Sequence, residues 1–163
     1  DLANNYGNLC QRVFSFMKKN CENKIPHKTN LIDTDKKFLN NLKESVPKLI
    51  NLMNDQDLNE YIKKVVSFSF EANKYFNDSE PWTVKKKNPE RMKNILFTIS
   101  QQIKNISILL NPIIPNATHK VLTSMNIPID NISISQINNM NSLNHEKELN
   151  NLEILFNKIE DDY

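Results

Sequence analysis

Apolar side chains recur every three to four residues along most of this 163-residue chain. The first such stripe, on residues 1–19, consists of Leu2, Tyr6, Leu9, Val13, Phe16 and Met17. Similar stripes follow in residues 33–53, 57–76, 89–110 and 116–125, and this spacing is that of an amphipathic helix. Helices with one apolar face must pack against one another, so the pattern predicts an all-α fold, an antiparallel bundle of about five helices.

Capping residues and prolines indicate where these helices begin and break. Asp33 or Thr34 is expected to cap the second helix, and Pro47 inside it predicts a kink or a break. Asn88 is expected to cap the fourth, because Pro89 after it suits the first helical position. The helical ends are therefore predicted at definite residues.

The helical pattern fades after residue 125. Residues 126–150 are rich in Asn and show short apolar alternations, and the chain closes with six acidic residues from Glu146 onward. We therefore expect two parts, a helical bundle over residues 1–125 and an irregular C-terminal segment over residues 126–163 that packs on the bundle.

Composition indicates an ordinary soluble globular protein, with 25% charged residues and a net charge of +2. No apolar run approaches the roughly 18 residues that a membrane-spanning helix needs, and no secretory signal opens the chain. Cys10 and Cys21 lack metal-binding spacing and are interpreted as reduced thiols of a cytosolic protein. His27, His119 and His145 stand in polar surroundings and are interpreted as surface residues.

The same sequence excludes the common catalytic motifs. A chain with one Gly contains no Gly-rich phosphate loop, and no G-x-S-x-G motif or Cys/His cluster occurs. Asp161 and Asp162 lie at the terminus, where solvated charge is the simpler interpretation. We expect no catalytic residue and no metal ligand in this chain.

The only tryptophan stands in the stretch EPWTVKKKNPER, which the pattern predicts to be a charged loop. Trp82 follows Pro81 and precedes Lys85, Lys86 and Lys87. A basic segment of this kind attracts phosphate groups. A solvated lysine run is the alternative, and charge alone favours it.

The polar face of the first helix suggests a binding surface. Asn5, Asn8 and Arg12 are spaced to share one stripe, and an amide beside a guanidinium suits the edges of unpaired bases. Gly7 lies beside them and indicates close approach by another backbone or a ligand. Because the chain uses Lys for most positive charges, Arg12 and Arg91 are expected to need the planar guanidinium. An exposed polar face with an incidental Gly is the alternative.

At these residues the sequence resembles a known family. The segment DLANNYGNLCQRVFSFMKKN is similar to the first helix of the anticodon-binding domain of bacterial methionyl-tRNA synthetases, which are class I aminoacyl-tRNA synthetases. The segment EANKYFNDSEPWTVKKKNPERMKNILFTISQQIKNISILLNPIIPNAT resembles the later helices, including the Pro-Trp pair and the Leu-x-Pro-x-x-Pro ending. The tail EILFNKIED resembles the closing segment of the family, so the resemblance extends over essentially the whole chain.

The resemblance implies roles for individual residues. Asn8 and Arg12 match the pair that bonds to anticodon bases in the family, and Asn5 on the same stripe would support them. Trp82 matches the residue that stacks on the first anticodon base, with Pro81 holding the turn. Our own inference adds contacts from residues 85–87 to the RNA backbone.

The resemblance also implies a larger enzyme. The ATP-binding motifs of the His-Ile-Gly-His and Lys-Met-Ser-Lys-Ser type do not occur in this sequence. The chain is therefore expected to be a C-terminal fragment of an ATP-dependent methionine–tRNA ligase, inactive alone, with ATP and magnesium bound by the absent catalytic domain. The implied partners are the anticodon loop of the methionine tRNA and that catalytic domain, toward which the LFNKIE segment would run.

Several further properties follow as expectations. The appended dimerisation module of some family members is absent from this sequence, so we expect a cytoplasmic monomer without a cofactor in this part. Two alternatives stay open at this point. The chain could be the anticodon-binding domain of another class I synthetase, or a non-catalytic helical scaffold that binds protein through apolar grooves.

Overall fold

Helices make up most of the first 125 residues. The structure, a computed structural model, describes residues 2–150. Its elements are α1 (Leu2–Asn20), α2 (Asp33–Asn54), α3 (Leu58–Ser79), α4 (Pro81–Lys87), α5 (Pro89–Leu110), α6 (Pro115–Ser124) and the short 3-10 helices η1 (Ile129–Asn131) and η2 (Ile134–Gln136). The described residues form no strand, so the predicted all-α class is confirmed, and the five predicted helices are present together with a sixth, α4.

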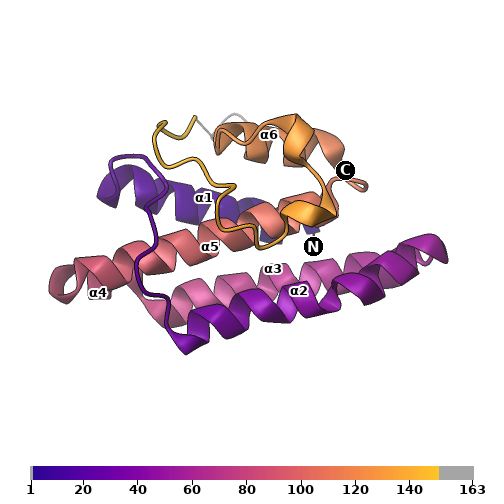
Figure 1. Cartoon of the computed structure of the whole chain (residues 1–163), viewed down its shortest axis with the longest axis horizontal. Coiled ribbons are helices and arrows are strands. Elements are labelled where there is room, and N and C mark those ends of the chain that lie inside the picture. The colour runs from indigo at the N-terminus through magenta and orange to yellow at the C-terminus, as the bar shows by residue number, and fades with distance from the viewer. Residues whose placement is uncertain (1, 151–163) are drawn as a thin grey trace.

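Helix α5 forms the centre of the bundle. It lies between α1 and α6 on one side and α2 and α3 on the other, and it contacts all five other α-helices (Figure 1). Every residue of α5 from Asn94 to Leu110 is buried. The core therefore surrounds one helix, and the remaining helices present their polar faces outward. Within the described part of the chain, no helix is long and apolar enough to span a bilayer.

Two helical starts agree with the sequence. The Asp57 side chain accepts a hydrogen bond from the Glu60 backbone N–H at 3.4 Å, at the start of α3. The Asn88 side chain accepts one from the Arg91 N–H at 3.0 Å, and Pro89 is the first residue of α5. Both are side-chain caps of the usual kind.

Helix α2 departs from the prediction at two points. Neither Asp33 nor Thr34 is the cap, because Ile32 occupies that position and its N–H donates to the Asp35 carboxylate at 3.1 Å. Of the kink or break predicted at Pro47, the break is wrong, since α2 continues through it. Pro47 is exposed, so water can satisfy the backbone carbonyl that loses its partner, while buried leucines on both sides hold the helix together.

The stretch predicted to be a charged loop is a short helix. Residues 81–87 form α4, which follows Glu80 in a left-handed conformation with φ 45° and ψ 58°. Pro81 is buried at the first helical position, where its fixed φ favours a helical start. Trp82 therefore projects from a short helix that packs on α5, and its ring contacts Phe76 of α3.

Residues 126–150 are irregular and pack on the bundle. Leu143 and Leu149 are buried, and Lys104 of α5 donates hydrogen bonds to the Asn139 carbonyl at 3.2 Å and to the Ser142 hydroxyl. Part of the helical bundle is thus covered by a segment that has little regular structure of its own. The LFNKIE segment and the terminal Asp residues lie outside the described residues.

The histidines are not three separate surface residues. His27 and His145 lie against each other with ring centroids 4.1 Å apart and planes tilted by 30°, although 118 positions separate them in the chain. The Nδ1 atom of His145 lies 2.8 Å from the Ile25 carbonyl oxygen, and burial lowers the pKa of His145. The sequence could not show this pairing, because the fold joins the C-terminal segment to the α1–α2 loop.

Candidate nucleic-acid-binding site

A row of polar side chains joins α1 to α3 at the surface. The Asn73 side-chain amide donates to the Asn5 side-chain oxygen at 3.2 Å, and the Asn73 oxygen accepts a hydrogen bond from Arg12 at 3.2 Å. The other guanidinium nitrogen of Arg12 donates to the Asn77 side-chain oxygen. The guanidinium is thus held by two amide oxygens on one helix. The predicted polar residues of α1 thus lie on one face of that helix, next to Asn73 and Asn77 of α3.

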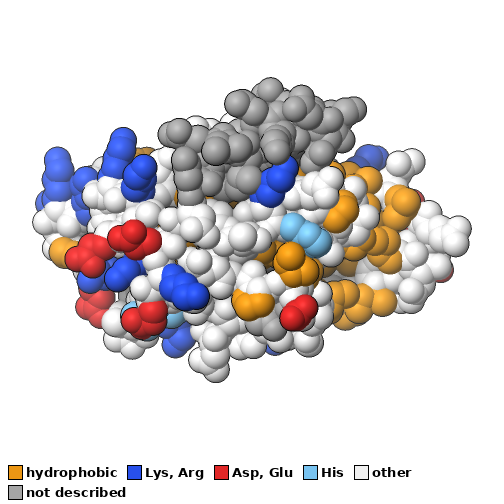
Figure 2. All heavy atoms as spheres, turned by 90° about the horizontal axis from the view of Figure 1, so that it is seen from above, with side chains coloured by type: hydrophobic (Ala, Val, Ile, Leu, Met, Phe, Trp, Pro, Cys, Tyr) orange, Lys and Arg blue, Asp and Glu red, His pale blue; other side chains and the backbone are white. Residues whose placement is uncertain are grey.

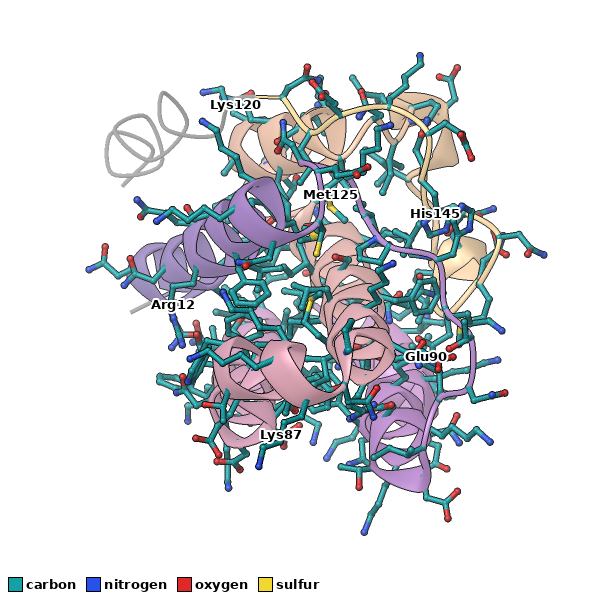
Figure 3. All side chains as sticks on the ribbon, turned by 90° about the vertical axis from the view of Figure 1, so that its left-hand side faces the viewer. Arg12, Lys87, Glu90, Lys120, Met125 and His145 are labelled. Atoms are coloured by element: carbon teal, nitrogen blue, oxygen red, sulfur yellow. The ribbon has the colours of Figure 1, made fainter. Side chains whose placement is uncertain are left out.

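This polar row surrounds an open hollow of about 430 Å³. Its lining consists of amide and guanidinium side chains, namely Asn5, Asn8, Gln11, Arg12, Asn73 and Asn77. Asn8 is exposed at its edge, and Arg12 projects from α1 at the molecular surface (Figure 3). Side chains of these types donate and accept hydrogen bonds in one plane, as the edges of unpaired bases require.

An aromatic contact connects this hollow to Trp82. The Arg12 guanidinium carbon lies 5.3 Å from the ring centroid of Phe76, which is buried. Trp82 meets the same Phe76 ring edge-on, with centroids 5.8 Å apart and planes at 72°. The Trp82 side chain is 39% exposed, so the ring is not part of the core. The fold therefore brings residues 12 and 82 to one surface, as the site hypothesis requires.

The three lysines of α4 have different environments. Lys85 donates to the Asn20 side-chain oxygen at 2.9 Å and so links α4 to the end of α1. Lys86 and Lys87 are exposed. Lys and Arg side chains are frequent at the end of the molecule where α4 lies, with Asp and Glu side chains among them (Figure 2). Helix α4 thus carries two exposed lysines, and its Trp82 contacts the same Phe76 ring as Arg12.

Arg91 lies away from this site and has a structural role. Its two terminal nitrogens donate to both oxygens of Asp35, at 2.6 and 2.9 Å, and Tyr75 donates to the same carboxylate at 2.6 Å. The expected need for a planar guanidinium is met here by a bidentate ion pair. Gly7 was expected to allow the close approach of another backbone or a ligand. The residue is buried, so the protein itself packs against it.

Three residues of the hollow were missed in the sequence, namely Gln11, Asn73 and Asn77. Asn73 and Asn77 are four residues apart on α3, a spacing that places both on one helical face. That spacing was a usable signal, but in a chain this rich in Asn it does not stand out.

Among the described residues, no group of three or more His, Cys, Asp or Glu side chains could hold a metal ion.

The fold agrees with the class that the motifs suggested. The structure superposes on the apo form of Mycobacterium tuberculosis methionyl-tRNA synthetase with a TM-score of 0.84 and 22% identity, over 93% of this chain and 31% of that one. A helical bundle of this arrangement is the anticodon-binding type of class I aminoacyl-tRNA synthetases. The family model described as the anticodon binding domain of methionyl tRNA ligase matches residues 25–163. The chain belongs to this family.

Curated relatives give the same family. The methionine–tRNA ligase of Brucella suis biovar 1 (strain 1330) is 34% identical over 130 residues, which are 80% of this chain and 25% of that protein. That of Methanosphaera stadtmanae is 32% identical over 132 residues, which are 81% of this chain and 20% of that protein. The chain thus spans about a quarter of the length of the first of these relatives. The matched range 25–163 contains Trp82 and the lysines of α4, whereas α1 precedes it.

Proposed function

We propose that this chain recognises the anticodon loop of the methionine tRNA. The observation that carries the proposal is the surface shared by α1, α3 and α4, where the Arg12 guanidinium is fixed by two amides beside the exposed Trp82 ring. Family membership supplies the RNA partner, and the geometry supplies groups that suit unpaired bases.

Each group in the site has a role in this proposal. Asn8 and Arg12 hydrogen-bond to base edges, and Trp82 stacks on the first anticodon base. Asn5 supports Arg12 through Asn73, and Pro81 starts the helix that carries Trp82. Residues 85–87 contact the RNA backbone, with the exposed residues 86 and 87 available for phosphates and residue 85 held beside α1.

The proposal extends to a parent enzyme. That enzyme joins methionine to its tRNA, as the names of the relatives support. In this proposal the reaction consumes ATP and releases AMP and diphosphate. In this proposal ATP and magnesium bind to a catalytic domain of the same polypeptide, and the present chain alone forms no methionyl-adenylate. The protein is a cytoplasmic monomer. Another class I synthetase is a weaker candidate, because the family model names the methionyl enzyme.

The test of this function is a binding titration with RNA stem-loops. The methionine anticodon stem-loop should bind more tightly than one in which only the first anticodon base is changed, and both affinities should fall as salt increases. A protein-binding scaffold would bind neither RNA. Equal binding of the two without salt dependence would overturn the proposal.

Trp82→Ala should weaken stem-loop binding by about 1 to 3 kcal/mol, the usual contribution of stacking one base on an aromatic ring. The midpoint of thermal unfolding should change little, because the ring is partly exposed. Binding is measured by fluorescence anisotropy of labelled RNA and unfolding by circular dichroism. A large loss of thermal stability with unchanged binding would place Trp82 in the core and remove it from the site.

Arg12→Lys should reduce discrimination between the two stem-loops although the positive charge is kept. A lysine ammonium cannot bond to Asn73 and Asn77 and also present a planar edge to a base. The ratio of the two dissociation constants is the measurement. Lys19→Arg, which leaves the hollow unchanged, is the control and should keep the ratio of the native protein. Full discrimination by the Arg12 variant would exclude Arg12 from base reading.

A further inference from the structure

Two aromatic side chains in the described part of the chain are exposed. Trp82 is one of them, and the other is Phe70 of α3, which is 54% exposed. Isolated exposed apolar residues are common on protein surfaces and need no explanation by themselves. The position of Phe70 relative to the amide hollow is what distinguishes it.

Phe70 lies on the row of α3 that forms the hollow. Phe70, Asn73 and Asn77 are spaced i, i+3 and i+7, so they share one helical face. Asn73 and Asn77 bind the Arg12 guanidinium, and Phe70 precedes Asn73 by about one turn. Trp82 lies beyond the other end of α3. Along the helix axis, Phe70 is about 10 Å from Asn77, at the usual rise per residue.

The two exposed rings therefore flank one polar surface. An unpaired RNA segment that crosses the hollow from Trp82 reaches Phe70 after it passes the amides and the guanidinium. Aromatic rings stack on any base, because every base presents a π-face. Amides and guanidinium between two rings give base-edge contacts in the middle and stacking at both ends.

We propose that Phe70 is a second stacking platform, which binds another unpaired base of the same RNA loop. This inference rests on the proposed function. Since stacking is tolerant of base identity, Phe70 adds affinity and leaves the choice of the first anticodon base to the hydrogen bonds of Asn8 and Arg12. The bound RNA segment then extends along α3 and is longer than the one that the α1 and α4 residues contact.

The test compares Phe70→Leu with Phe70→Tyr in the titration of the methionine anticodon stem-loop. Leucine keeps an apolar side chain but removes the ring, and binding should weaken roughly 5- to 150-fold. Tyrosine keeps the ring and should bind like the native protein. The preference for the correct first base and the thermal midpoint should stay unchanged in both variants.

Two controls locate the effect. Leu58→Ala changes another exposed apolar residue of α3, 47% exposed at its first position, and should not alter binding. A set of stem-loops, each abasic at one loop position, locates the base that stacks on Phe70. One of them should bind the native protein more weakly than the intact stem-loop does, while the Phe70→Leu variant should bind that stem-loop and the intact one equally. If Phe70→Leu binds like the native protein while Trp82→Ala binds weakly, the second platform is overturned and the proposed function stands. If neither substitution affects binding, the proposed function fails.

Discussion

Asp35→Ala should lower the free energy of unfolding by about 3 to 5 kcal/mol, the usual cost of removing one partner of a buried ion pair. The Asp35 side chain is fully buried and accepts hydrogen bonds from Arg91, Tyr75 and the Ile32 N–H. Its removal leaves a largely buried guanidinium and a buried hydroxyl without their acceptor, and it also removes the acceptor of the Ile32 N–H at the start of α2. Urea unfolding monitored by circular dichroism at pH 7 is the measurement.

The exposed pair Lys74–Asp78 on α3 provides the matched control. Its atoms are 2.8 Å apart, but both side chains are mostly exposed. Asp78→Ala should therefore leave the unfolding midpoint almost unchanged. Equal losses of stability in Asp35→Ala and Asp78→Ala would show that the buried ion pair of Asp35 stabilises the protein no more than the exposed pair does.

The same cluster should contribute to acid sensitivity. Burial raises the pKa of Asp35, but hydrogen bonds from Arg91 and Tyr75 outweigh it and hold the pKa below the usual 3.8. Because the unfolded chain binds the proton more readily, this contribution is present above about pH 4 and is lost as the pH falls through the folded-state pKa. The Asp35→Ala variant lacks this contribution. The difference in the free energy of unfolding between the native protein and this variant should therefore shrink as the pH falls below about 4.

Lys104 should make the stability of the protein rise with pH. The side chain is 1% exposed, and burial lowers its pKa from 10.5 to about 7. Between these values the unfolded chain binds more protons than the folded chain, so raising the pH favours the folded state. Below pH 7 both states are protonated and the full cost of burying the charge remains.

The measurement is the free energy of unfolding of the native protein relative to Lys104→Met between pH 7 and 8.5. This difference should increase with a slope that approaches about 1.4 kcal/mol per pH unit. The pH range stops below the ordinary pKa of tyrosine, so that tyrosines do not titrate within it. Other groups that titrate are common to both proteins, so their contributions cancel in the difference. The control is Lys147→Met, at an exposed lysine of the C-terminal segment that Lys104 contacts, and it should show no such slope. A flat difference for Lys104 would mean that its ammonium keeps its ordinary pKa in the folded protein.

The helices could be predicted from sequence because their information is local. The periodic stripe of α3 and the caps Asp57 and Asn88 depend on residues within a few positions of one another. Pro47 misled the prediction because the cost of a proline depends on whether water reaches the carbonyl it leaves unpaired, and that is decided by tertiary packing. The helix at residues 81–87 was missed because seven residues carry too little periodicity to distinguish a helix from a loop.

The candidate site could be predicted only in part for the same reason. Asn8, Arg12 and Trp82 were found through their spacing and the family resemblance, and the structure brings them to one surface without testing their roles. Asn73 and Asn77 were missed because their importance arises from contact with a helix 61 to 65 positions earlier. The contact between the His27 and His145 rings was missed for the same reason, since long-range pairing has no local pattern.

The two arginines of the chain show how the partner of a cation decides its use. Arg91 faces a carboxylate, which fixes the guanidinium and also cancels its field. Arg12 is oriented by the neutral amides of Asn73 and Asn77, so its direction is fixed while its charge remains uncancelled by these partners. Orientation before binding reduces the entropy lost in forming a complex. The Arg12 guanidinium between α1 and α3 is thus held in one orientation, so in the proposed complex it would lose little conformational entropy on binding RNA.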